Sequence, residues 1–316
     1  MSNNQRLSIV KCYISEQSVN ILKLRLKISL ILILALVTFS SQASHLVGGY
    51  MNYEFLEIAP NGEHRYKIRL NIYRDDLNSD VQFTPSIKLG VYLNDNDQNI
   101  NQIAVFNLVT KYEVKPPGSI NCDYFQKLVK IEYGLYEGII SLKPNTAGYQ
   151  LAFMQCCRNE QNNILQDGTG PTQGQTYYCK IPDTSLENSS PAFYGVPSPY
   201  MCVNDTNSFL FDAVDKDGDS LVYRVMKPFA GGSIGNSNPD PESTLDLKSL
   251  FYNTGYTYLQ PFGNGGYISV DSSTGRTLLY SQEIGRFVIG VEVVEYRNGF
   301  ELSRIRMDLQ IDVLNC

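Results

Sequence analysis

The sequence contains no tryptophan, only two histidines and no excess of basic side chains, and these shortages exclude several classes of function. Two histidines leave little room for histidine-based catalytic triads or histidine-rich metal sites. The 26 basic against 32 acidic side chains give a formal net charge of −6. Nucleic-acid binding and polybasic attachment to a membrane surface both need a basic face, so the composition argues against both. Aromatic packing is instead supplied by 22 Tyr and 14 Phe.

Long hydrophobic runs are also scarce, apart from one near the N-terminus. A basic stretch precedes the apolar run Ile28–Phe39, and small residues stand at Ser41 and Ala43, which are positions −3 and −1 of a cut after Ala43. This pattern is typical of a secretory signal peptide, here residues 1–43. The run is shorter than the ~20 residues of a spanning helix, so we expect cleavage, with no transmembrane segment in the mature chain. Removing the segment changes the net charge from −6 to −10. The signal peptide itself predicts a secreted or cell-surface protein.

The cysteines agree with export, because six remain after the signal peptide and an even number in a secreted chain predicts disulfides. Adjacent Cys156 and Cys157 are not expected to bond to each other, since disulfides prefer Cα atoms ~5.5 Å apart, more than a trans peptide allows. A bond between Cys202 and Cys316 would close a long loop worth about 4–5 kcal/mol. The partners left for the adjacent pair are then Cys122 and Cys179, in either order. The disulfide candidates are therefore Cys122, Cys156, Cys157, Cys179, Cys202 and Cys316.

Alternation of polar and apolar residues with period two dominates the chain after the signal peptide, and it predicts half-buried strands separated by Asn, Asp, Gly and Pro turns. A short helix-like pattern at Ser243–Phe251 is the longest outside the signal peptide, and βαβ units are absent, so the fold class is predicted to be all-β. The predicted strands lie at residues 65–73, 86–93, 127–133, 148–155, 176–181, 207–211, 220–225, 267–270, 286–293 and 304–313.

A change of composition near the middle of the chain divides these strands into two groups. The stretch Asn188–Tyr200 is rich in Pro, Ser and Gly, as in a linker or the first extended strand of a new domain, and the strand pattern restarts after it. We therefore predict two tandem β-sandwich domains, residues 44–190 and 191–316. Pro228–Pro241 is predicted to be a long surface loop, a kind of segment that is often functional or disordered.

The sharpest local motif is Asp215-x-Asp217-Gly218-Asp219, which places three carboxylates at alternate positions around a turn glycine. Ca²⁺ takes six to eight hard oxygen ligands, and such a loop supplies several of them. Glu295 and Asp308, on late strands, are candidates for further ligands. The alternative is a solvated, Asp-rich hairpin turn, because Asp and Gly are common turn residues in any case.

Acidic residues also raise the possibility of a secreted glycan-binding or glycan-degrading protein. Glu283, Glu292 and Glu295 are candidates for the carboxylate pair that glycoside hydrolysis needs. Glu292 and Glu295 differ in strand parity, however, so on a regular strand they face opposite sides and do not meet. We therefore expect a non-enzymatic protein and keep the glycan-directed function as the alternative.

Six segments occur in order along the chain: Ala43–Met51, Ile72–Asp75, Gln155–Asn159, Asn188–Pro191, Asp215–Tyr223 and Val293–Gly299. Together they resemble the N-terminal region of large secreted Bacteroidetes proteins, described as gliding motility-associated or PKD-domain-containing. The resemblance implies immunoglobulin- or cadherin-like sandwiches and an adhesin-like role in adhesion or surface assembly, with an unidentified surface protein or glycan as partner. It implies no catalytic residues. The chain departs from similar members at Phe55 and Asp76, where they often carry Cys.

Overall fold

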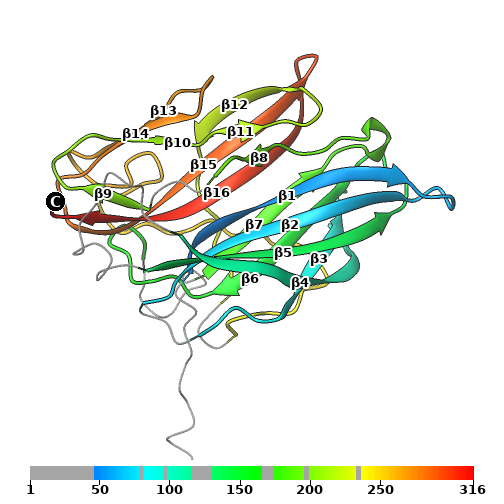
Figure 1. Ribbon diagram of the computed structural model, residues 1–316, viewed down its shortest axis with the longest axis horizontal. Coiled ribbons are helices and arrows are strands. Elements are labelled where there is room, and N and C mark those ends of the chain that lie inside the picture. The colour runs from blue at the N-terminus through cyan, green and yellow to red at the C-terminus, as the bar shows by residue number, and fades with distance from the viewer. Residues whose placement is uncertain are drawn as a thin grey trace, which may run out of the picture. The chain divides into compact units, whose positions relative to one another are not determined.

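Regular structure is almost entirely β-strand, as the alternation predicts, and the strands pair antiparallel with one exception (Figure 1). The computed structural model describes residues 46–77, 81–95, 98–114, 130–165, 174–195, 199–232 and 236–316, so the predicted signal peptide and Cys122 lie outside the described residues. Within these ranges there is no α-helix, and Ser243–Phe251 is irregular, with isolated β-bridges at Thr244 and Ser249. The same ranges contain no helix with the length and apolarity that crossing a bilayer requires.

The elements follow one another along the chain, and the longest connection joins β12 to β13. They are β1 (Leu46–Ile58), β2 (His64–Asp75), β3 (Ser86–Leu93), β4 (Ile100–Val114), β5 (Ile131–Leu142), β6 (Tyr149–Cys156), β7 (Gly174–Ile181), the 3₁₀ turn η2 (Thr184–Leu186), β8 (Ala192–Phe193), β9 (Tyr200–Cys202), β10 (Asn207–Leu210), β11 (Ala213–Val214), β12 (Ser220–Val225), β13 (Tyr267–Val270), β14 (Arg276–Tyr280), β15 (Gly285–Arg297) and β16 (Phe300–Leu314).

One large sheet runs through both predicted halves of the chain. Its order is β12-β15-β16-β1-β2-β5-β4-β3-β6-β7, with β9 added in parallel beside the end of β16. Two small sheets accompany it, β10-β14-β13 and β11-β8. β1 is the joint, because it pairs with β2 from the first half and with β16 from the second.

A glycine pair in β1 makes this joint possible. A Cβ on Gly48 would lie 2.2 Å from the Asp308 carbonyl oxygen, and a Cβ on Gly49 would lie 2.1 Å from the Asn71 carbonyl oxygen. Any side chain at these positions would therefore separate β1 from one of its two neighbours. Glycine is the residue that allows such close backbone approach.

Two large hydrophobic clusters fill the unit Ala43–Cys316. One takes its buried members only from residues 46–181, on β1 to β7. The other is built mainly from residues 193–313 and also receives Val47, Tyr50, Tyr73 and Ile131 from the first half. The cores thus follow the two predicted halves, whereas the large sheet is shared. The structure is all-β, and its division into two tandem domains stays a prediction.

The disulfides agree with the sequence at one place and differ at another. Cys202 and Cys316 are bonded, with Cα atoms 5.5 Å apart, as predicted. Cys156 and Cys157 are bonded to each other, so the expectation that each reaches elsewhere was wrong. That expectation assumed a trans peptide, but the peptide is cis and the Cα atoms are 3.1 Å apart. Cys179 is a buried free thiol, and burial raises its pKa.

Candidate metal centre

The Asp-rich loop lies between β11 and β12 and is ordered by its own first carboxylate. Oδ1 of Asp215 accepts hydrogen bonds from the backbone N–H of Asp217 at 3.0 Å and of Asp219 at 2.9 Å. Gly218 follows with a φ of +82°, a conformation that favours glycine. These hydrogen bonds and the turn glycine would by themselves explain the motif as a plain Asp-rich turn, without a metal ion.

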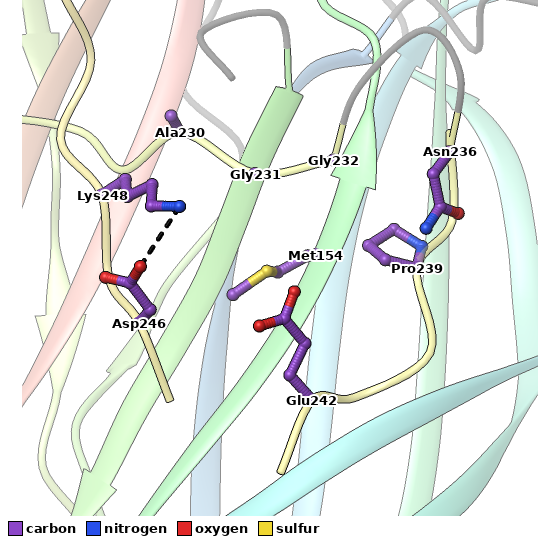
Figure 2. Close-up of a pocket in the computed structure, with 9 residues that line it drawn as sticks. All are labelled: Met154, Ala230, Gly231, Gly232, Asn236, Pro239, Glu242, Asp246 and Lys248. Carbon is purple, nitrogen blue, oxygen red and sulfur yellow. Dashed lines mark ion pairs between the residues drawn. The ribbon is translucent and has the colours of Figure 1, made fainter. Parts of the chain in front are cut away.

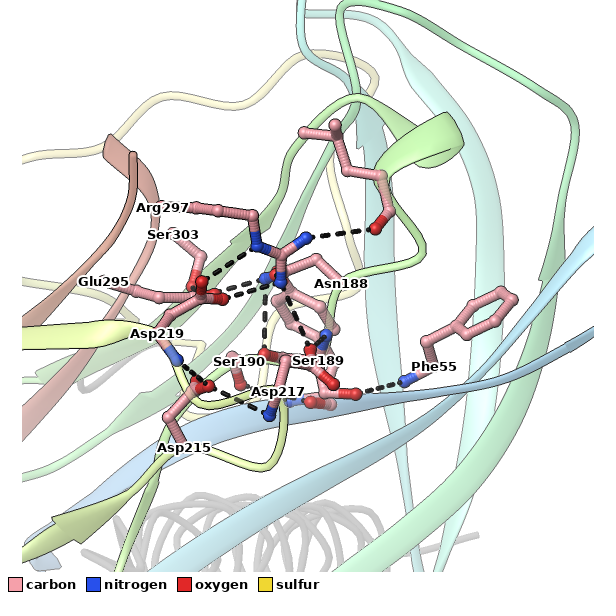
Figure 3. Close-up of polar contacts among 12 residues, drawn as sticks. Phe55, Asn188, Ser189, Ser190, Asp215, Asp217, Asp219, Glu295, Arg297 and Ser303 are labelled. Carbon is pink, nitrogen blue, oxygen red and sulfur yellow. Dashed lines mark hydrogen bonds and ion pairs between the residues drawn. The ribbon is translucent and has the colours of Figure 1, made fainter. Parts of the chain in front are cut away.

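The turn nevertheless brings the three aspartates together. One carboxylate oxygen from each of Asp215, Asp217 and Asp219 lies within 4.8 Å of the others, in an arrangement that could hold a metal ion. Among the described residues, no other group of three or more His, Cys, Asp or Glu side chains meets this geometry. Figure 3 shows the three side chains around the turn.

Glu295, predicted as a fourth ligand, lies on β15 with its carboxyl beside that of Asp219, but it is not one of the three acids whose oxygens lie within 4.8 Å of one another. Its side chain is fully buried at 0% exposure. Oε2 accepts hydrogen bonds from Nδ2 of Asn188 at 3.0 Å and from the Ser303 hydroxyl. Oε1 has no donor among the described residues, and the neighbouring carboxyl group is that of Asp219. Burial, with that neighbour and the charge of Asp215, raises the pKa of Glu295 to about 8.

The remaining acids differ in how well they are compensated. Oδ2 of Asp215 is buried without a partner in the described structure, and burial raises the pKa of this carboxyl. Oδ2 of Asp217 accepts the backbone N–H of Ser189 at 2.7 Å. Arg297 lowers the pKa of Asp219. Two buried carboxylate oxygens at this site therefore lack a donor.

Arg297 is the main member of the site that the sequence did not single out. Its guanidinium binds both oxygens of Asp219, with Nε–Oδ1 at 2.8 Å and Nη2–Oδ2 at 2.6 Å, and it also donates to Oδ1 of Asn188 at 2.7 Å. The available signal was its position two residues after the candidate ligand Glu295. Arg297 also lies 3.7 Å from Oδ2 of Asp217, so it pairs with two of the three loop aspartates.

The segment Asn188–Ser190, predicted only as a linker, also belongs to the site. The Ser189 hydroxyl accepts the backbone N–H of Phe55 at 3.2 Å, and the Ser190 hydroxyl accepts that of Tyr53 at 2.9 Å. These bonds attach the segment to β1, and the Asn188 and Ser189 contacts described above attach it to the acids. The site therefore connects the first half of the chain to the second.

Two other predicted acids lie elsewhere. Asp308 forms a buried ion pair with Arg158, with Nη1–Oδ1 at 2.8 Å, so its assignment as a further ligand was wrong. Glu292 belongs to a separate cluster of arginines and does not meet Glu295, as strand parity predicted. Glu283 accepts the Tyr256 hydroxyl at 2.8 Å.

The donor set indicates which ions the site suits. The available atoms are carboxylate oxygens, which are hard ligands typical of Ca²⁺. Histidine and cysteine are absent from the donor set, so it does not resemble sites for softer metals. Comparison of the chain with protein-family models, with curated proteins and with solved structures finds no match.

Proposed function

We propose that this is an exported, non-enzymatic, adhesin-like protein in which Ca²⁺ bound by Asp215, Asp217, Asp219 and Glu295 stabilises the fold. The observation that carries the calcium proposal is the buried Oε1 of Glu295, which has no donor among the described residues, in a carboxyl group that lies beside that of Asp219. A buried carboxylate without a compensating partner is costly, so the arrangement requires a proton or a cation.

The spacing of the aspartates is compatible with a single Ca²⁺ ion. Ca²⁺–oxygen distances are about 2.3–2.6 Å, so two ligands on one ion lie at most ~5 Å apart. The three aspartate oxygens lie within 4.8 Å of one another. They can therefore surround one ion, with further ligands from Glu295 and water.

The bound ion would act as a structural link. Asn188 and Ser189 connect β1 to the acids, and Lys216 forms an ion pair with Glu54 of β1 at 2.6 Å. A cation at this point would fix the Asp loop, the strand β15 and the connecting segment together. It would stabilise the native state by mass action, since the unfolded chain offers no preformed site.

The wider role rests on the resemblance to gliding motility-associated and PKD-domain-containing surface proteins. Immunoglobulin- or cadherin-like sandwiches, a cell-surface location and a partner that is a surface protein or glycan belong to the same proposal. The all-β fold and the Cys202–Cys316 disulfide suit a protein that works outside the cytoplasm. Protease accessibility on intact cells tests this part: we expect cleavage without lysis, and full protection would contradict surface exposure.

Calorimetric unfolding in Ca²⁺ and in EDTA tests the metal. We expect the melting temperature to rise with Ca²⁺ and this rise to disappear in Asp217→Asn. Asp205→Asn, which removes a charge from an exposed acid outside the site, is the matched control and should keep the response. A melting temperature unmoved by Ca²⁺ and EDTA would contradict the proposed cation.

A further inference from the structure

A second candidate binding site lies beside the loop that follows β12. A cavity of about 210 Å³ opens there, and its lining includes Met154, Gly231, Gly232, Glu242, Asp246 and Lys248 (Figure 2). None of these residues belongs to the metal centre. The volume is below the ~300–1,000 Å³ of pockets for drug-sized ligands, so it suits one side chain or a small molecule.

The floor of the cavity is held tightly against the sheet. The Thr176 hydroxyl of β7 donates to the Ala230 carbonyl at 2.5 Å. A Cβ on Gly231 would lie 2.4 Å from Oγ1 of Thr176, so the backbone packs directly on the strand. The sequence predicts a surface loop here, whereas Ala230 and Gly231 are buried. Met154 of β6 and Pro239 add apolar surface to this floor and wall.

The charges around the cavity do not balance. Asp246 is paired with Lys248 at 3.2 Å, and nearby Asp240 is paired with Lys88 at 2.7 Å. Glu242 has no ion pair among the described residues. Figure 2 shows its carboxylate directed toward Met154, while the Asp246 carboxylate is directed toward Lys248. The cavity thus combines apolar surface with one spare negative charge.

Tyr92, which lies next to the cavity, gives a second indication that the Glu242 charge faces this region. Tyr92 lines an adjoining pocket together with Met154 and Glu242. Its pKa is raised by burial and, secondly, by the negative charge of Glu242. The negative charge of Glu242 is therefore felt at the side of the cavity where Tyr92 lies.

We propose that this cavity binds a primary ammonium on a short aliphatic stem, as in a lysine side chain. The methylene groups would contact Met154 and Pro239, and the ammonium would donate to the Glu242 carboxylate. Lysine side chains bury their stems on apolar surface in this way while the charged end stays near water. The shared chemistry is found in a lysine of a protein partner and in a free alkylamine.

Nuclear magnetic resonance of ¹³C-methyl-methionine protein tests the proposal directly. The Met154 methyl signal is assigned with Met154→Leu. We expect it to shift saturably with Nα-acetyl-lysine-N-methylamide and with n-butylamine, and not with the uncharged norleucine analogue. A lysine derivative that binds more tightly than butylamine indicates a protein partner; equal affinities indicate that the ammonium and its stem suffice.

Four variants make the test specific. Glu242→Gln should weaken binding about two- to five-fold, as expected for one partly exposed ion pair. Asp205→Asn should leave binding unchanged, and Lys248→Gln should strengthen it by removing a competing cation. Asp217→Asn should leave it unchanged, so failure here is distinguishable from failure of the calcium proposal. Equal shifts with the norleucine analogue, or unchanged binding in Glu242→Gln, would overturn the inference.

Discussion

Two glutamates of β15, Glu292 and Glu295, are three residues apart and almost fully buried, at 4% and 0% exposure, yet their surroundings are opposite. Glu292 is surrounded by arginines: Nε of Arg224 lies at 2.5 Å, Nε of Arg306 at 3.1 Å and Nη1 of Arg304 at 3.5 Å. Glu295 receives only neutral donors, from Asn188 and Ser303, and lies beside Asp219.

The difference shows that the same sheet compensates a buried negative charge in two ways. An ionised buried carboxylate needs a compensating cation. Around Glu292 the chain supplies this charge itself, from β12 and β16. At the Glu295 site Arg297 pairs with Asp217 and Asp219, and Glu295 has no ion pair among the described residues. We infer that the remaining charge there is supplied from solution, by a divalent cation or, without one, by a proton.

The largest expected effect is a difference in how Glu→Gln substitution at the two positions changes the free energy of unfolding. Glu292→Gln leaves the arginines without their carboxylate and should lower the free energy of unfolding by roughly 2–4 kcal/mol, a buried-pair loss reduced by the partial exposure of the arginines. Glu295→Gln should be neutral or stabilising in EDTA, because it removes an uncompensated acid. Urea unfolding followed by circular dichroism measures both. Equal losses of unfolding free energy in the two variants would contradict the claim that only Glu292 is compensated by the chain.

Calcium should have the next largest effect, and only at the Glu295 site. At a concentration of 100 times the dissociation constant, Ca²⁺ should add about 2.7 kcal/mol to the free energy of unfolding. Asp217→Asn should lose most of this gain, whereas Glu292→Gln should keep it despite its lower stability. Urea unfolding with Ca²⁺ or EDTA gives the difference. A gain that survives in Asp217→Asn would place the ion elsewhere.

The pH dependence of stability should distinguish the two sites by a smaller change in the free energy of unfolding. The pKa of Glu295 is about 8 in the folded protein against an ordinary value of 4.5. Between these values the folded state binds more protons than the unfolded state, so stability falls as pH rises. This contribution is complete below pH 4.5 and lost above about 8. In EDTA, wild type should therefore lose stability over this window relative to Glu295→Gln; parallel pH profiles would contradict the raised pKa.

The smallest effect concerns the ion pair that fastens the Asp loop to β1. Lys216 is mostly exposed, so Lys216→Ala should cost only about 0.2–1 kcal/mol. The loss should be reduced at high salt, because exposed pairs are screened. Thermal unfolding at low and high salt checks this. A much larger loss would show that the pair, and not a cation, holds the loop.

Sequence patterns predicted the strands best where one face meets a core. Ser86–Leu93, Ser220–Val225 and Tyr267–Val270 were placed with the observed bounds. β1 was missed as a strand, because its Gly48-Gly49 pair interrupts the alternation. Those glycines serve contacts with β16 and β2 that are distant in sequence. Strand propensity carries no information on such contacts.

The candidate site was predictable in its local part and not in its distant part. The Asp215–Asp219 spacing sufficed because a single turn brings the acids together. Arg297 and Asn188 join through pairing of segments far apart in the chain, which periodicity does not reveal. The Cys156–Cys157 bond was missed for another reason, because a cis peptide is the exception at non-proline residues.

Calorimetric titration of the metal-free protein with Ca²⁺ tests the central claim most directly. The account predicts saturable binding of one ion, lost in Asp217→Asn and retained in Glu292→Gln. Protons should be released on binding at pH 7, seen as heats that depend on the buffer, because Glu295 exchanges its proton for the ion. The absence of saturable binding, or unchanged binding in Asp217→Asn, would contradict the account.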